Sequence, residues 1–115
     1  MNLETILTHY LVAVLWTDEH DLGEGFSVCD FTQESKDNAM RDITAFTNEA
    51  KDLLENWNDE QIGHDFWLIR VGHGAGFWDR DETEFPNGQA ITEICHKYDF
   101  HGHTFSQDGK VFIEG

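Results

Sequence analysis

The residues best suited to chemistry lie in one stretch, residues 63–80, which reads GHDFWLIRVGHGAGFWDR. Its polar members combine imidazole, carboxylate and guanidinium groups: His64, Asp65, Arg70, His73, Asp79 and Arg80. An acid–base pair with an arginine is sufficient for general acid–base catalysis when the groups converge in one pocket. In a plainer interpretation, Arg70 and Asp79 pair across a hairpin, while Arg80 and Asp81 are solvated. Because no nucleophile accompanies the group, we favour the plainer interpretation.

A second candidate for chemistry is a histidine pair near the C-terminus. His101 and His103 fall on the same face of an expected strand, because side chains repeat every second residue. That spacing can chelate zinc, with His96 or Asp99 as a third ligand. No cysteine pair and no His-Glu-x-x-His motif supports zinc, so we expect exposed histidines and no cofactor.

The stretch 63–80 is itself predicted to form a β-hairpin. Phe66 and Leu68 alternate with Trp67 and Ile69, as in a strand at residues 64–71 that is covered on both faces. The glycines around His73 predict the turn, and residues 75–79 the return strand. His73 then lies at the hairpin tip, either merely exposed or presented on a backbone that a ligand can approach closely.

Three helices are predicted to support this hairpin. Residues 2–16 carry apolar side chains at helical spacing, with Asn2 as the N-cap. Residues 33–57 give the clearest helical pattern, with Thr32 or Ser35 as the cap and an acidic outer face. Residues 90–98 form a shorter third helix.

The remaining elements are short. Residues 17–25 hold several acids and two glycines and predict a loop, and residues 26–31 a short strand or an extended lead-in. Residues 100–105 and 110–113 predict a second hairpin, because Asp108-Gly109 is a strong turn signal. We therefore expect an α+β fold: an antiparallel sheet of about four strands, in two hairpins, with three helices packed on it.

Length and composition predict one domain, residues 1–115, with too much hydrophobic content (39%) for a disordered chain. The longest apolar run, residues 11–16, is far shorter than the roughly 20 residues that span a bilayer, so no membrane partner is expected. The first residues include Glu4 and no Lys or Arg, unlike a signal peptide. Cys29 and Cys95 are accordingly expected to be reduced, buried thiols of a cytosolic protein.

The charge is strongly one-sided. There are 23 Asp and Glu against seven Lys and Arg, which gives a net charge of −16 over 115 residues. A surface of this kind repels phosphate, so direct nucleic-acid binding is not expected. It attracts basic surfaces instead, including the nucleic-acid clefts of other proteins. The alternative is that the charge serves only solubility or adaptation to salt.

The stretch 63–80 resembles the signature of a family of small, mostly uncharacterised bacteriophage proteins, which reads close to GHDFWLTRNGHGAGFWDR. This chain departs from that signature at Ile69 and Val71. Looser features also match, namely Leu15-Trp16 at the end of the first helix and Asp108 to Lys110 near the C-terminus. The resemblance implies phage origin and location in the cytoplasm of a bacterial host, and it supplies no reaction.

These observations favour a non-enzymatic interaction protein that binds a basic or nucleic-acid-binding protein of the host or of its defences, with imitation of the charge of DNA as one way of doing so. The residues expected to form the interaction surface combine acids of the long second helix with aromatic residues of the hairpin: Asp37, Glu49, Asp52, Glu55, Trp67, His73 and Trp78. The alternative is a small enzyme or metal-binding protein with its site on residues 63–80. A third possibility is a structural phage component whose charge serves only solubility.

Overall fold

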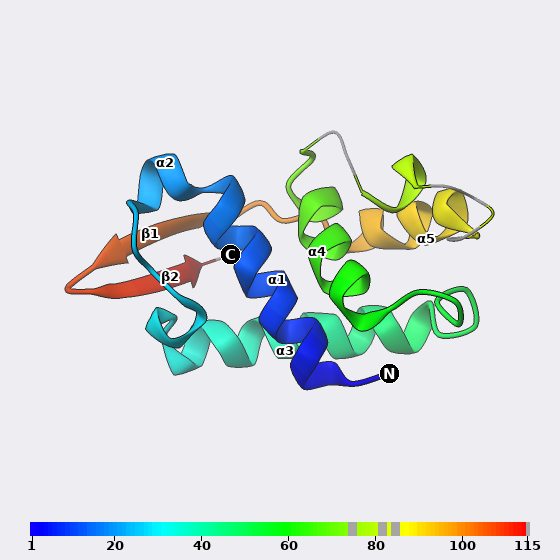
Figure 1. Cartoon of the computed structure of the whole chain (residues 1–115), viewed down its shortest axis with the longest axis horizontal. Helices are drawn as coiled ribbons and strands as arrows, with labels where there is room; N and C mark the ends of the chain where they lie inside the picture. The colour runs from blue at the N-terminus through cyan, green and yellow to red at the C-terminus, as the bar shows by residue number, and fades with distance from the viewer. Residues whose placement is uncertain (74–75, 81–82, 84–85, 115) are drawn as a thin grey trace.

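Helices dominate the computed structural model, which describes residues 1–73, 76–80, 83 and 86–114. The α-helices are α1 (Leu3–Thr17), α2 (Glu19–Leu22), α3 (Gln33–Glu49), α4 (Asp59–Arg70) and α5 (Gly88–Cys95). Single 3-10 turns are η1 (Val28–Asp30), η2 (Phe77–Asp79) and η3 (His96–Tyr98), and the strands are β1 (His103–Gln107) and β2 (Lys110–Glu114). Figure 1 shows α1 and α4 at the centre, with the strands and α2 at one end and α5 at the other.

The core is built on the contact between α1 and α4. Asn2 caps α1 by accepting a hydrogen bond from the Thr5 amide, as predicted, and Asn58 caps α4 in the same way. Gly63 lies where the helices cross, and a Cβ there would fall 2.2 Å from the Ile6 carbonyl oxygen. The absence of a side chain at residue 63 therefore sets how closely the two helices approach.

The predicted hairpin at residues 63–80 is wrong, because residues 63–70 belong to helix α4 and Phe77–Asp79 form the 3-10 turn η2. The apolar run at residues 66–69 suits a buried strand or a buried helix equally well, and here all four side chains are buried on a helix. Gly72, with φ +67°, ends α4 in a Schellman motif. The amides of Gly72 and His73 donate to the carbonyls of Ile69 and Leu68. Gly74 and Ala75, also part of the predicted turn and return strand, lie outside the described residues.

The second helix was predicted at residues 33–57, but α3 ends at Glu49. Thr32 caps its start, one of the two predicted caps. Beyond Ala50 the chain continues in turns, although Leu54 and Trp57 remain buried as the apolar spacing implied. The Trp57 indole donates to the Pro86 carbonyl at 2.9 Å and packs edge-on against Phe77, contacts that direct this segment toward η2 and α5.

The C-terminal hairpin is confirmed, although its first strand, predicted at residues 100–105, is β1 at His103–Gln107. Gln107 pairs with Lys110, and Asp108 and Gly109 between them both have positive φ, as a two-residue hairpin turn of this type requires. The third helix is also confirmed as α5, continued by η3. Residues 26–31, predicted as a short strand or a lead-in, form η1 and a single parallel bridge from Phe31 to Val111.

The fold class therefore differs from the expected one. Over the described part of the chain, the only sheet is the two-stranded β1–β2 pair, and the four-stranded sheet with three helices on it is wrong. The physical reason is the single misassigned segment, since α4 replaces the expected strand at residues 64–71 and Phe77–Asp79 of the expected return strand form η2. Within the described ranges, no helix has both the length and the apolar character needed to cross a bilayer.

Candidate functional site

The predicted polar site is divided between two clusters, the first centred on Asp65 of α4. Its buried carboxylate accepts two hydrogen bonds from Arg80, Nε to Oδ2 at 3.0 Å and Nη2 to Oδ1 at 2.6 Å. Gln61 Nε2 donates at 2.8 Å, and His64 Nδ1 lies 3.4 Å from Oδ1. Burial raises the pKa of Asp65, but the hydrogen bonds from His64, Arg80 and Gln61 outweigh it and hold the pKa below its ordinary value of 3.8.

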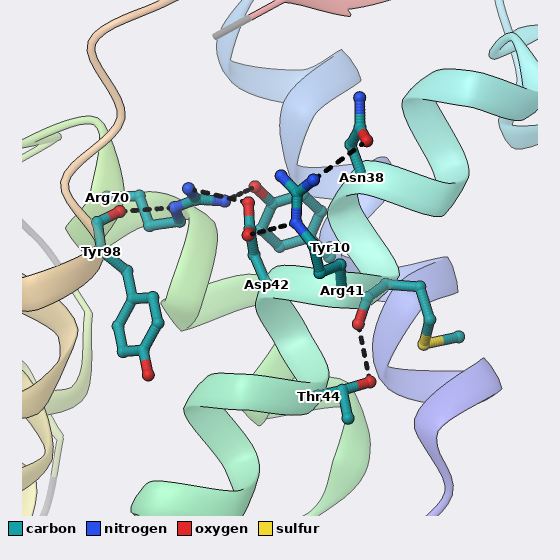
Figure 2. Close-up of polar contacts among 8 residues, drawn as sticks. Tyr10, Asn38, Arg41, Asp42, Thr44, Arg70 and Tyr98 are labelled. Atoms are coloured by element: carbon teal, nitrogen blue, oxygen red, sulfur yellow. Dashed lines mark hydrogen bonds and ion pairs between the residues drawn. The ribbon is translucent and has the colours of Figure 1, made fainter.

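The second cluster is centred on Arg70, at the end of α4 (Figure 2). Its Nε donates to the Tyr98 carbonyl and its Nη1 to the Tyr10 hydroxyl, both at 2.7 Å, and its Nη2 lies 3.1 Å from Asp42 Oδ2. The guanidinium also lies over the rings of Phe66 and Phe100. Four segments, α1, α3, α4 and η3, are joined at this one side chain.

The expected cross-strand pair of Arg70 with Asp79 is therefore wrong. Arg70 pairs with Asp42 of α3, and Arg80 pairs with Asp65, while Asp79 is exposed on η2. Asp81 lies outside the described residues. Arg80 and Arg70 each bind a carboxylate inside the fold. These two polar clusters therefore stabilise contacts between segments and do not form one acid–base site.

A cavity of about 400 Å³ opens beside the Arg70 cluster. Arg41, Lys97 and His101 contribute to its wall together with Asp42 and Asp99. Arg41 approaches Asp42 and Asn38 at 3.4 and 3.5 Å, and Lys97 pairs with Glu49. The cations that line this cavity are thus balanced by neighbouring carboxylates.

The two histidines of the predicted site do approach a common residue, Trp16 at the end of α1. The rings of His64 and His73 lie 5.8 and 5.3 Å from the Trp16 ring. Trp16 is nevertheless 57% exposed. The result is an exposed aromatic cluster of one indole and two imidazoles, with Asp65 behind His64.

Next to this cluster lies an apolar groove of about 510 Å³ that the sequence analysis did not predict. We call it the Trp16 groove; its apolar walls are Val12, Leu15, Trp16, Phe26 and Val28, and its acidic wall residues are Glu19 and Glu24. Residues 17–25 were expected to be only an acidic loop. Val12 and Trp16 lie four residues apart on α1, and both large apolar side chains remain exposed, which their spacing alone does not reveal.

The predicted interaction residues are scattered. Asp37 and Glu49 are exposed on α3, but Asp52 and Glu55 lie in the turns after its end. Hydrogen bonds from Lys97 and Tyr98 hold the pKa of Glu49 below its ordinary value. Figure 1 shows α3 as one straight helix that stops well before α4 begins, so the four acids do not share a helical row.

The aromatic members of that set separate as well. Trp67 is buried in the core and donates from Nε1 to Thr17 Oγ1 at 2.8 Å, so its assignment to an interaction surface is wrong. Trp78, on η2, is 44% exposed, and His73 is exposed beside Trp16.

The alternative of a zinc site at His101 and His103 can be compared with the positions of these side chains. Among the residues that the structure places, no three His, Cys, Asp or Glu side chains come together as metal ligands would, so the zinc alternative gains no support. The His103 ring stacks on Phe105 of the same strand.

The two cysteines differ in exposure. Cys95 is buried as expected, and burial raises the pKa of its thiol. Cys29 is exposed on η1, so its assignment to the core is wrong.

Comparison with known proteins does not decide between these sites. No family model, curated protein or solved structure matches the chain. The resemblance of residues 63–80 to small phage proteins therefore stays a prediction, and the functional argument depends on the geometry above.

Proposed function

We propose that this chain is a non-enzymatic interaction protein that binds a basic surface of another protein. Its acidity and the resemblance of residues 63–80 to phage proteins together favour a partner in the cytoplasm of a bacterial host, either a host protein or a component of its defences. Binding would inhibit a nucleic-acid enzyme if the bound surface were its nucleic-acid cleft.

The observation that carries this proposal is that most of the Lys and Arg side chains are already paired with carboxylates of the same chain. Four of the seven Lys and Arg side chains, Arg41, Arg70, Arg80 and Lys97, form ion pairs with only three carboxylates. The acids outnumber the bases threefold, and exposed acids occur on α1, α2, α3, α4, α5 and both ends of the C-terminal hairpin region. The field outside the protein is therefore negative, which accelerates and stabilises encounters with basic surfaces.

The polar clusters support a binding role over catalysis. Asp65, the buried carboxylate with the strongest claim to acid–base work, already accepts hydrogen bonds from Arg80 and Gln61 and has a lowered pKa. A general base active near neutral pH needs the opposite shift. Arg70 likewise binds three partners of the fold.

DNA mimicry, the stricter form of the proposal, receives less support than binding by general acidity. Asp37 and Glu49 are twelve residues apart on α3, about 18 Å at the usual helical rise. Arg41 and the neutral residues Thr44, Ala45 and Asn48 lie between them on the exposed side. Phosphates along a DNA strand repeat at a much shorter interval, roughly 3.4 Å along the helix axis.

The test is capture of partners by the immobilised chain from a bacterial lysate, read by mass spectrometry across a salt gradient. We expect retained proteins to be enriched in basic and nucleic-acid-binding species and to elute as salt screens the charges. A matched column would carry a variant with Asp37, Asp52, Glu55 and Glu93 changed to their amides, which lowers the negative charge without touching the ion pairs above. Equal retention on both columns, or retention indifferent to salt, would contradict the proposal. Competition with duplex DNA then separates cleft binding from binding elsewhere.

One observation favours a second function, acid–base chemistry at His64. Asp65 lies at His64 Nδ1, and His73 and His64 both contact Trp16, so two imidazoles are grouped with Trp16 and a buried carboxylate lies behind His64. A panel of chromogenic ester and phosphodiester substrates would test it. Turnover by the wild-type chain that is lost in His64→Ala and retained in His101→Ala would establish the site, and no turnover would remove it.

A further inference from the structure

We propose that the Trp16 groove binds an apolar side chain carried on a Lys- or Arg-containing segment of the partner. This inference depends on the proposed function, because it names the chemistry of the partner and the place where it docks. The groove lies between the C-terminal half of α1 and the segment that joins α2 to η1.

Exposure of apolar surface is the first reason. Among the described residues, the large hydrophobic side chains that remain exposed are Met1, Val12, Trp16 and Trp78. Two of these four, Val12 and Trp16, line the same groove, where Leu15, Phe26 and Val28 add further apolar surface. Contiguous exposed apolar surface with a polar rim marks interaction sites in soluble proteins, and Trp is enriched among the residues that dominate binding energy.

The groove is also held in shape from both sides. The Trp16 indole is flanked by the rings of His64 and His73, which position it although it is exposed. Asp30 accepts a hydrogen bond from the Ser27 amide at 2.8 Å and fixes the opposite wall. Ser106 of β1 donates to the Leu22 carbonyl at 2.8 Å and fixes the end of α2. A preformed groove binds more tightly, because less conformational entropy is lost on binding.

The acidic residues around the Trp16 groove favour a positively charged binding partner. Glu19 and Glu24 belong to the groove wall, and Asp21 is exposed on the intervening turn of α2. A second copy of the chain is disfavoured, because it would bring another net charge of −16 against this wall. A segment with an apolar side chain between cations satisfies both surfaces, since the side chain enters the groove while Lys or Arg faces the glutamates.

The direct test uses short synthetic peptides with a central Leu flanked by lysines, together with matched peptides that carry Ala at the centre or Glu in place of Lys. Binding would be followed by amide and indole chemical shifts of the isotope-labelled chain. We expect the Leu-centred basic peptide to shift Trp16 and residues 12–28. The Ala-centred peptide should bind about tenfold more weakly, because it buries less apolar surface.

Matched variants localise the effect. Trp16→Ala and Val12→Lys should each weaken binding of the Leu-centred peptide about tenfold, whereas Trp78→Ala, which removes the other exposed Trp and lies outside the groove, should leave it unchanged. Glu19→Gln with Glu24→Gln should weaken binding more than Glu55→Gln with Glu93→Gln, although both pairs change the net charge equally. Circular dichroism confirms folding, and Val12→Lys tests the site even if Trp16→Ala fails to fold.

The outcomes separate this inference from the proposed function. If the basic peptides bind equally with Leu or Ala at the centre, or if both glutamate pairs have the same effect, the groove is not the docking site while general attraction of basic surfaces stands. If the basic peptides do not bind and the lysate columns retain no basic protein, the proposed function fails as well.

Discussion

Helix α4 takes part in two Asp–Arg ion pairs, and the two pairs differ in which member is buried. In the first, the Asp65 side chain is 0% exposed and its partner Arg80 is 28% exposed. In the second, the arginine is the buried member, with Arg70 at 9% and Asp42 at 25%. The same chemical pair thus buries its anion on one side of the helix and its cation on the other.

The inversion matters because the two buried ions differ in what they can do when the partner is lost. A buried carboxylate can take up a proton and become neutral, whereas a guanidinium keeps its charge at every pH at which the protein folds. The Arg70 cluster also joins four segments, while the Asp65 cluster joins α4 to the chain that follows η2. We therefore expect the Arg70 pair to matter more for stability and the Asp65 pair more for pH dependence.

The largest effect should follow Arg70→Ala. This change leaves the buried Tyr10 hydroxyl without its Arg70 donor, removes the ion pair at Asp42 Oδ2 and removes the group packed over Phe66 and Phe100. We expect a loss of about 3 to 5 kcal/mol in the free energy of unfolding, measured by urea denaturation. Arg41→Ala is the matched control, since Arg41 is largely exposed and contacts the same Asp42, and its effect should be below about 1 kcal/mol. Similar losses in both variants would show that Arg70 is not a structural centre.

Arg80→Met should cost about 3 kcal/mol at neutral pH, the lower end of the range for breaking a buried pair. In this variant only the hydrogen bonds from His64 and Gln61 oppose burial, so the folded-state pKa of Asp65 should lie above its wild-type value. A carboxyl with a higher folded-state pKa takes up its proton in the folded state at higher pH, which stabilises the variant relative to wild type as pH falls. Arg80→Met should therefore recover part of its loss of stability as pH falls from neutrality toward the ordinary value of 3.8.

The control for that pH dependence is the double variant Asp65→Asn with Arg80→Met. It keeps the shape of the site and removes the titrating group, so its stability relative to wild type should be flat over the same interval. In the wild type, the lowered pKa of Asp65 gives stability above the ordinary value of 3.8 that is lost only in stronger acid. If the single and double variants show the same profile, Asp65 is not the responsible group.

A smaller effect is expected from Gly63→Ala, which tests the helix contact that carries both pairs. The added Cβ would lie 2.2 Å from the Ile6 carbonyl oxygen, so α1 and α4 must separate, at a net cost of about 2 kcal/mol. Helix propensity alone predicts the opposite sign, a gain of about 1 kcal/mol. The sign of the change in urea denaturation therefore decides whether the close approach exists.

The sequence analysis succeeded where local signals agree with packing. Asn2, Thr32 and Asp108-Gly109 each determine an element boundary through their own backbone and side-chain preferences, and all three predictions are confirmed. It failed at residues 63–80, because an apolar run buried on all sides has no period that distinguishes strand from helix. Gly72 added to the error, since a positive φ serves a helix cap as well as a hairpin turn.

The candidate site shows the same limit. His64 and Asp65 were correctly placed together, because they are neighbours in the chain, but their contacts with Trp16, Gln61 and Arg80 depend on the fold. The pairing of Arg70 with Asp42 and Tyr10 joins segments far apart in sequence, and no local pattern marks it. The Trp16 groove was missed for a different reason: exposure, and not spacing, distinguishes Val12 and Trp16 from the core residues of α1.

The smallest expected effect is that of Tyr10→Phe, which removes one acceptor from Arg70 and leaves the rest of the cluster in place. We expect a loss of about 1.5 kcal/mol in the free energy of unfolding, as for one hydrogen bond to a charged group.

Burial raises the pKa of Tyr10 to about 12, although the nearby Arg70 charge acts in the opposite direction. Its contribution to stability is therefore full below the ordinary value of 10.0 and is lost as pH rises through about 12. Absorbance of phenolate should show less than half of the tyrosine ionised at pH 10.0 in the folded wild type, since the pKa of Tyr98 is raised too. Tyr10→Phe should remove the later of the two transitions; a normal tyrosine titration in the wild type would show that the Arg70 cluster is open to water.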